Sequence, residues 1–217
     1  MSPPDIIVVG AGGHAAVVAD AVQASGRRVR GFVDTDRARH GGTVIGLPVL
    51  GDDGALGHLD KAQVELANGI GGAGQPGTEG RRERVQTRLE AQGWRFATVR
   101  HPSCIVAASA SISDGAQLMA GCVVQPNARI GRGAIVNTRA VVEHDAQVGD
   151  FAHVASGAVL CGDVKIGHGC HVGAGATVRQ GVVLGDHVVV GLGAAVVADA
   201  TCGVLVGVPA RRKEIRT

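Results

Sequence analysis

The sequence predicts an α/β N-terminal domain with a small Rossmann-like parallel sheet, followed by a parallel β-helix of hexapeptide repeats. From Val106 to Val196, every sixth residue is aliphatic without exception. The residue four positions after each of them is Ala, Cys or Val. A helix repeats its buried face every 3.6 residues and a strand every second residue, so neither alone produces a strict period of six. This period is typical of the coils of a parallel β-helix.

A second period indicates the size of one coil. Gly131, Gly149, Gly167 and Gly185 are 18 residues apart, which predicts three hexads per coil, and we expect these glycines at a corner that needs a positive φ. Each residue should then lie about 4.8 Å from the residue 18 positions later. This register stacks acidic and basic side chains along one corner, which we interpret as a structural edge ladder. The ladder consists of Asp114, Arg132, Asp150, His168 and Asp186.

The first part of the chain alternates strands and helices, which predicts a small parallel sheet. We therefore divide the chain into a Rossmann-like α/β domain at residues 1–100 and a β-helix domain at residues 101–217. The expected elements are a strand at 5–9, a glycine turn at 10–14, a helix at 15–24, a strand at 29–33, a helix around 52–59, a strand at 64–67, a helix at 78–92 and a strand at 94–99.

Composition excludes several classes of partner. The 217 residues carry a net charge of +2, which gives no electrostatic reason to expect nucleic acid or an anionic membrane. There is no leader-like N-terminus and no apolar run long enough to cross a bilayer, so we expect a cytoplasmic protein. The cysteines form no CxxC pair and are interpreted as packing residues. They are Cys104, Cys122, Cys161, Cys170 and Cys202.

The glycine turn Gly10-Ala11-Gly12-Gly13 lies between a predicted strand and a predicted helix. Backbone N–H groups and a helix N-terminus in this setting face an anion such as a phosphate. Asp34, at the end of the second predicted strand, is placed to meet a ribose hydroxyl. Ala15 replaces the third glycine of the dinucleotide fingerprint, so a nucleotide-sugar is the better ligand. The alternative is a turn that the fold needs only for packing.

Two histidines of the β-helix are candidate functional residues. In the repeat register Val142 points inward, so Glu143, His144 and Asp145 occupy a corner between faces. A carboxylate beside an imidazole fixes its tautomer and raises its basicity, as a general base requires. His153 points outward from a flat face half a coil later, so the two histidines need not meet within one subunit. The alternative is that both are only solvated.

Five segments together resemble one known family. They are Gly12-Gly13-His14, Phe32-Val33-Asp34, residues 137–145, residues 148–153 and residues 207–210. These segments resemble the bacterial nucleotide-sugar N-acetyltransferases, which share a family with the sialic acid O-acetyltransferases. The resemblance covers nearly the whole chain. It implies a left-handed β-helix, a homotrimer with acetyl-CoA between neighbouring β-helices, and a nucleotide-sugar in the N-terminal domain.

The resemblance also implies roles for individual residues. His144 matches the general base, and Asp145 stands where the family often has the longer glutamate. His153 matches a residue that contacts the carrier of the acetyl group. Further residues matching acetyl-CoA contacts are Ala174, Gly191, Leu192 and Gly193. Residues matching nucleotide-sugar contacts are Gly12, Gly13, His14, Asp34, Thr35, Gly71 and Asn137.

We therefore predict acetyl transfer from acetyl-CoA to the amino group of a nucleotide-linked amino-deoxysugar, with no metal. Direct attack without an acyl-enzyme is expected, because the cysteines map to the interior and Ser156 has no obvious activator. One alternative is O-acetylation of a sialic acid or related sugar. Another is a zinc-dependent lyase of the β-helix carbonic anhydrase type, for which His153 and His171 would need a third ligand. An NAD-dependent oxidoreductase and a purely structural solenoid are further alternatives.

Overall fold

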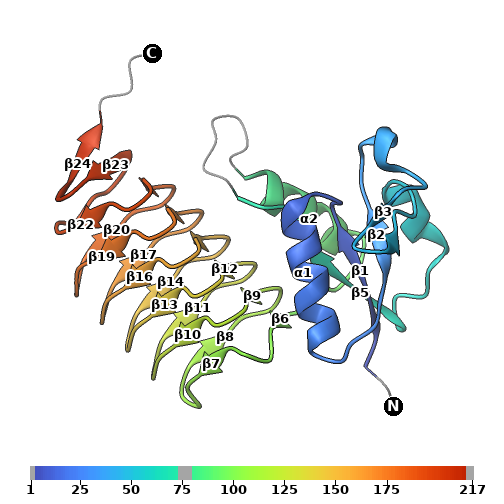
Figure 1. Cartoon of the computed structure of the whole chain (residues 1–217), viewed down its shortest axis with the longest axis horizontal. Coiled ribbons are helices and arrows are strands. Elements are labelled where there is room, and N and C mark those ends of the chain that lie inside the picture. Colours follow the sequence, from blue (N-terminus) through green and yellow to red (C-terminus); the bar gives the residue numbers. More distant parts are fainter. Residues whose placement is uncertain (1–2, 73–79, 214–217) are drawn as a thin grey trace. The chain divides into compact units, whose positions relative to one another are not determined.

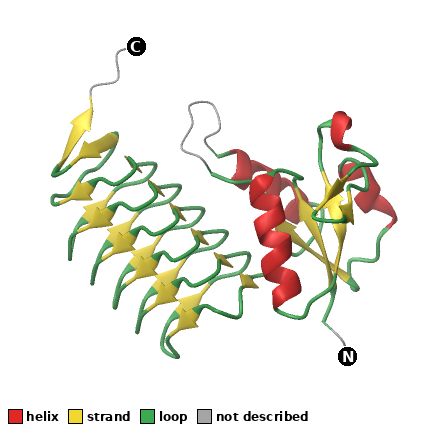
Figure 2. Ribbon diagram, viewed as in Figure 1, coloured by secondary structure: helices red, strands yellow, loops and turns green. Residues whose placement is uncertain are grey.

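The computed structural model describes residues 3–72 and 80–213 and divides the chain into two compact units. The first unit is Met1–Gly71 with Arg81–Pro102, and the second is Gly72–Gly80 with Ser103–Thr217. A small parallel sheet with helices makes up the first unit, and a β-solenoid makes up the second (Figures 1 and 2). Both parts of the predicted fold class are confirmed. Within the described ranges, no helix has the length and apolar character needed to cross a membrane.

The sheet of the first unit has three parallel strands in the order β2-β1-β5. Their bounds are Asp5–Val9 for β1, Val29–Val33 for β2 and Val64–Asn68 for β5. The central strand is buried from Ile6 onward, as expected for a parallel strand that is covered on both faces. Helix α1 (Gly13–Ala24) buries Val18 and Val22, and helix α2 (Arg81–Ala91) buries Leu89. The expected start of the second helix, at Thr78, lies outside the described residues.

The remaining elements of this unit are short. They are η1 (Arg37–Arg39), β3 (Thr43–Val44), β4 (Leu47–Pro48), η2 (Asp53–His58) and β6 (Val99–Arg100). The helix expected around 52–59 is a 3₁₀ helix, since its two glycines disfavour an α-helix. The strand expected at 94–99 is wrong for most of its length. Trp94 and Phe96 are buried there, but only Phe96 forms a bridge, to Leu66.

Between Ile105 and Val196 the solenoid strands are two residues long and fall in turn on three faces. The first face contains β7 (Ile105–Val106), β10 (Val123–Val124), β13 (Val141–Val142), β16 (Val159–Leu160), β19 (Thr177–Val178) and β22 (Ala195–Val196). The second face contains β8 (Ser111–Ile112), β11 (Arg129–Ile130), β14 (Gln147–Val148), β17 (Lys165–Ile166) and β20 (Val183–Leu184). The third face contains β9 (Gln117–Leu118), β12 (Ile135–Val136), β15 (His153–Val154), β18 (His171–Val172), β21 (Val189–Val190), β23 (Val204–Gly207) and the antiparallel β24 (Ala210–Lys213).

The strand register and the interior follow the predicted periods. Val123 pairs with Val141 and Val141 pairs with Val159, each 18 residues apart. The aliphatic sixth positions and the small positions between them form one continuous buried core. Cys104, Cys122 and Cys170 belong to that core, and burial raises the pKa of the Cys170 thiol to about 11. The packing interpretation is wrong for Cys202, which is exposed.

The glycine column has a different physical reason from the one expected. Gly131, Gly149, Gly167 and Gly185 do not have a positive φ. A Cβ at Gly149 would instead approach the carbonyl carbon of Gly167 to 2.5 Å, so the close stacking of coils excludes any side chain. The left-handed backbone occurs two residues later, where Phe151 has a φ of 54°.

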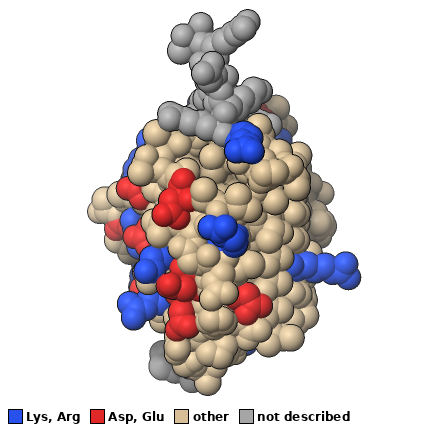
Figure 3. All heavy atoms as spheres, turned by 90° about the vertical axis from the view of Figure 1, so that its left-hand side faces the viewer, with Lys and Arg blue, Asp and Glu red and all other residues tan. Residues whose placement is uncertain are grey.

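Two carboxylates of the predicted edge ladder bind the backbone of the neighbouring coil. Asp150 Oδ1 accepts a hydrogen bond from the backbone N–H of Arg132 at 2.8 Å, and Asp186 Oδ1 accepts one from His168 at 2.7 Å. The carboxylates therefore bind the backbone of the preceding coil, and the Arg132 guanidinium lies over the Phe151 ring at 4.7 Å. On the molecular face drawn in Figure 3, charges of both signs are interspersed.

Candidate active site

The glycine turn lies at the carboxyl edge of the three-stranded sheet. It follows β1 directly, and Gly12 is the N-cap of α1, so backbone N–H groups of the first helical turn point outward beside it. A Cβ built at Gly12 or Gly13 would meet no atom within 4 Å. Packing therefore does not require glycine at these two positions, which favours a ligand-facing turn over the packing alternative.

Asp34 holds the glycine turn in place. Its Oδ2 accepts the backbone N–H of Ala11 at 2.7 Å, and its Oδ1 accepts the backbone N–H of Asp36 at 2.8 Å. Arg39 adds a second link, because its Nη1 donates to the carbonyl of Ala11 at 2.8 Å. The His40 Nε2 donates to the carbonyl oxygen of Asp34 at 2.7 Å. Sequence reasoning missed both Arg39 and His40, since neither belongs to a recognisable motif.

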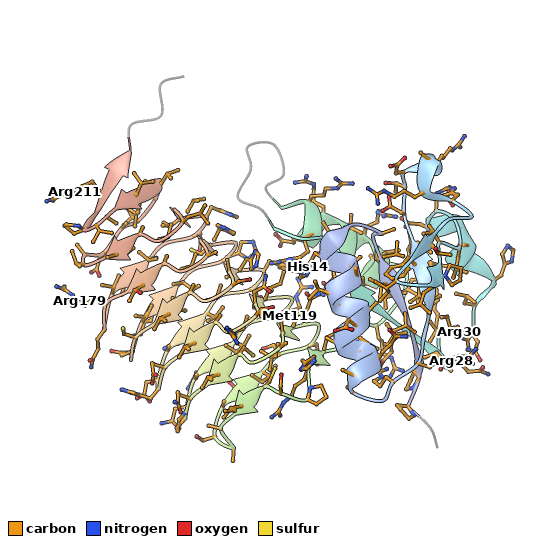
Figure 4. All side chains as sticks on the ribbon, viewed as in Figure 1. His14, Arg28, Arg30, Met119, Arg179 and Arg211 are labelled. Atoms are coloured by element: carbon orange, nitrogen blue, oxygen red, sulfur yellow. The ribbon has the colours of Figure 1, made fainter. Side chains whose placement is uncertain are left out.

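The predicted nucleotide-sugar residues of this unit gather at the same edge. His14 lies in the first turn of α1 (Figure 4), and a Cβ at Gly71 would approach the Cβ of His14 to 3.2 Å. Thr35 is exposed directly after Asp34. The three segments that supply these residues follow β1, β2 and β5. In open parallel sheets the carboxyl ends of the strands are where ligands bind.

His144 lies at the corner between the first and second faces of the solenoid, between β13 and β14. The adjacent Asp145 has a φ of 61°, and this left-handed turn brings its carboxylate back toward the imidazole. Asp145 Oδ2 is 2.8 Å from His144 Nδ1. Because an ionised carboxylate can only accept, Nδ1 carries the proton and Nε2 is left as the acceptor. The shorter aspartate therefore does reach His144.

The surroundings of His144 favour its protonated form. The hydrogen bond with Asp145 raises the pKa of His144 above its usual value; desolvation acts against this, while the charges of Asp145, Glu143 and Asp163 add to it. The hydrogen bonds from His144 and Asn127 lower the pKa of Asp145. An imidazole with a raised pKa is a stronger base in its neutral form.

Two residues that sequence reasoning missed complete this corner. Asn127 Nδ2 donates to Asp145 Oδ1 at 3.0 Å. Gly162 lies so close to the imidazole that a Cβ there would fall 2.5 Å from His144 Nε2. The 18-residue period could have identified both residues, because Asn127 precedes Asp145 by one coil and Gly162 follows His144 by one coil.

Asn137 and His153 form a second pair, away from His144. Asn137 Oδ1 accepts the backbone N–H of Thr138 at 2.7 Å, which directs its Nδ2 toward His153 Nε2 at 3.1 Å. His153 Nε2 is therefore an acceptor, and its proton is on Nδ1. The side chain is nearly buried on the third face, where its ring meets His171 edge-on with centroids 5.0 Å apart.

The predicted acetyl-CoA residues line the corner between the third and first faces. Ala174 follows β18, and the run Gly191-Leu192-Gly193 follows β21 one coil later. The backbone N–H of Gly193 donates to the carbonyl of Ala174 at 2.9 Å, and Leu192 is 80% exposed. Asn137 lies at the same corner, directly after β12. Within one chain this corner and the corner of His144 are on different sides of the solenoid.

The residues that the structure describes do not provide a complete set of metal-ligating side chains. No group of three or more His, Cys, Asp or Glu side chains there could hold a metal ion. The pair His153 and His171 thus finds no third ligand of these types among the described residues. A catalytic zinc site needs three protein ligands, so the zinc lyase alternative would require a ligand from outside the described residues of this chain.

Two family models match parts of the chain. The PglD N-terminal domain matches residues 5–75, and the bacterial transferase hexapeptide (six repeats) matches residues 145–180. A search of curated proteins finds no match.

Comparison with solved structures extends the similarity to the whole chain. A histidine-to-asparagine variant of perosamine N-acetyltransferase from Caulobacter crescentus, in complex with CoA and GDP-perosamine, is 34% identical, with 99% of each chain covered and a TM-score of 0.89. The acetyltransferase domain of PglB from Neisseria gonorrhoeae FA1090, in complex with acetyl coenzyme A, is 33% identical, with 98% of this chain and 100% of that chain covered and a TM-score of 0.87. WeeI from Acinetobacter baumannii AYE, at 24% identity and a TM-score of 0.84 over 97% of this chain and 100% of that one, supports the fold alone.

Proposed function

The chain belongs to the family of bacterial nucleotide-sugar N-acetyltransferases and sialic acid O-acetyltransferases, hexapeptide-repeat acyltransferases, and we propose that it acetylates the amino group of a nucleotide-linked amino-deoxysugar. The observation that carries this proposal is the 34% identity, over 99% of both chains, to a perosamine N-acetyltransferase whose structure holds CoA and GDP-perosamine. The sugar amine is the acceptor and acetyl-CoA is the donor.

His144 acts in this proposal as the general base. The amine nitrogen attacks the thioester carbonyl carbon of acetyl-CoA, and a tetrahedral centre forms. His144 Nε2 accepts the proton that the nitrogen loses, while Asp145 stabilises the resulting imidazolium through Nδ1. The carbon–sulfur bond then breaks, and the CoA thiolate takes up a proton to leave as the thiol. No acyl-enzyme is needed, because the amine attacks the thioester directly.

The nucleotide part of the acceptor binds at the carboxyl edge of the small sheet. The first turn of α1 offers N–H groups and the positive end of the helix dipole to the diphosphate. Asp34 keeps the turn in this shape through Ala11, and it accepts a ribose hydroxyl with its remaining lone pairs. Gly12, Gly13, His14, Thr35 and Gly71 line the same edge.

Acetyl-CoA binds along the corner between the third and first faces. Ala174, Gly191, Leu192 and Gly193 line that corner, and His153 lies on the third face beside it. Asn137, which is expected to contact the nucleotide-sugar, follows β12 at the same corner. His144 is on another side of the same solenoid, so a neighbouring copy must bring its His144 to this corner. This requirement supports a homotrimer with parallel solenoid axes. Val123, Val141 and Val159 form an apolar stripe on the first face that such packing would cover.

The function is tested by following release of the CoA thiol. Purified protein is incubated with acetyl-CoA and either GDP-perosamine, as one nucleotide-linked amino sugar, or a sialic acid. We expect thiol release and an N-acetylated product with nucleotide-linked amino sugars and none with sialic acid. Release with sialic acid alone would replace the N-acetyltransferase proposal by O-acetylation. Light scattering on the same sample should report a trimer, and a monomer would refute the intersubunit site.

A further inference from the structure

Asn127 lies at the corner of His144 and contacts the carboxylate beside it. It precedes Asp145 by one coil, in the same column of the solenoid. Its Nδ2 donates to Asp145 Oδ1 at 3.0 Å, while His144 Nδ1 donates to Oδ2 of the same carboxylate at 2.8 Å. The two oxygens of Asp145 thus have different partners, one of which is the proposed base.

The backbone fixes where the Asn127 amide lies. Asn127 has a φ of 62°, a left-handed conformation that asparagine tolerates better than most residues. Its own N–H donates to Ser109 Oγ at 3.1 Å, and the N–H of Asp145 donates to the carbonyl of Pro126 at 3.0 Å. Both side chains are short and start from hydrogen-bonded turns, so their contact depends on few rotatable bonds.

A second anchor matters because the pair of His144 and Asp145 is exposed. The two side chains are 54% and 51% exposed. An exposed ion pair contributes little free energy, so this pair alone does not hold the two side chains in one geometry. We infer that Asn127 is a positioning residue: it fixes the Asp145 carboxylate so that His144 keeps its proton on Nδ1 and offers Nε2 to the substrate amine. This inference rests on the proposed role of His144 as the general base.

The carboxylates around His144 indicate how loss of the Asn127 side chain would change the pKa and the tautomer of the imidazole. Asp145, Glu143 and Asp163 all favour the protonated imidazole, but only Asp145 does so through a hydrogen bond. Without the Asn127 amide the carboxylate is able to rotate away from Nδ1. The pKa of His144 then falls toward its usual value, and the imidazole loses its fixed tautomer.

The test removes the amide and leaves the backbone unchanged. Asn127→Gly suits this purpose, because glycine adopts a φ near 62° without strain. The matched control is His187→Gly, at a φ of 57° in a different corner column. We expect Asn127→Gly to lower kcat by up to about 10²-fold, the cost of a misplacement of about 1 Å. An NMR titration of the imidazole should show a lower pKa for His144, and the control should match the wild type in both.

A double-mutant cycle separates positioning from a general loss of stability. In the Asp145→Asn background, Asn127→Gly should cause little further loss of kcat, because the two residues act through the same hydrogen bond. An equal loss in both backgrounds, or a wild-type His144 pKa in Asn127→Gly, would overturn the inference. His144→Ala is measured alongside: unchanged kcat in that variant would refute the proposed base itself, which is a different failure.

Discussion

Replacing Gly162 by alanine would displace the proposed base without altering its chemistry. A Cβ at Gly162 would fall 2.5 Å from His144 Nε2 and 2.6 Å from Cε1. Ordinary van der Waals contact begins at 3.4 Å, so the ring must retreat by about 0.9 Å, the difference between 3.4 Å and 2.5 Å. Gly162 does not have a positive φ, so alanine adds no backbone strain there.

A retreat of this size acts on the reaction and hardly on the fold. The imidazole is half exposed and can swing outward, but it then stretches its 2.8 Å hydrogen bond to Asp145 or carries Nε2 away from the amine. Since a misplacement of about 1 Å can cost about 10²-fold in rate, we expect kcat to fall by roughly that factor. The melting temperature should stay near that of the wild type, because the atoms that move are at the surface.

The assay is initial-rate release of the CoA thiol at saturating concentrations of both substrates. Gly57→Ala serves as the control, since a Cβ at Gly57 meets nothing within 4 Å and its backbone is not left-handed. The control should keep the wild-type kcat. A wild-type kcat in Gly162→Ala, with the substitution verified and the protein folded, would refute the assignment of His144 as a positioned base.

Three further predictions concern the interior, the nucleotide site and pH. Ala140 is fully buried, so Ala140→Leu should lower the free energy of unfolding by about 1–3 kcal/mol in thermal melts. Ala140→Cys should be tolerated, because Cys122 occupies the same position one coil earlier. Equal stability of the two variants would contradict the register. Asp34→Ala should raise KM for the nucleotide-sugar and leave KM for acetyl-CoA unchanged, because loss of the carboxylate frees the Ala11 N–H and loosens the glycine turn. A change in the KM for acetyl-CoA alone would show that the turn is misassigned. Because the hydrogen bond with Asp145 raises the pKa of His144 and only the deprotonated imidazole can act as a base, kcat/KM should rise with pH through that raised pKa. Asp145→Asn should move the rise to lower pH, and an unmoved profile would mean that another group limits the rate.

The repeat period made the solenoid predictable in detail. Pairings such as that of Val123 with Val141 follow from the register alone, because each coil repeats the same sizes of side chain at the same places. The glycine turn and the position of Asp34 were also predictable from the sequence, since a strand, a turn and a helix in that order leave few other arrangements. In each case a local pattern determined the local structure.

Contacts at the corners of the solenoid were not predictable in the same way. The register placed Asn127 beside Asp145, but whether their side chains meet depends on left-handed φ values that the composition does not reveal. Gly149 shows the reverse error: a positive φ was expected, whereas close stacking of coils is what excludes a side chain there. The segment at 94–99 shows a third limit, because it was expected to be one strand but forms an isolated bridge at Phe96 and enters a strand only at Val99.

The most direct test of the account is kcat of His144→Ala with acetyl-CoA and a nucleotide-linked amino sugar. Loss of a positioned general base typically lowers the rate by about 10²–10⁴-fold, and we expect a decrease in this range with KM for acetyl-CoA little changed. His153→Ala, measured in parallel, should instead raise KM for acetyl-CoA. A near wild-type kcat in His144→Ala together with its loss in His153→Ala would contradict the account and reverse the two roles.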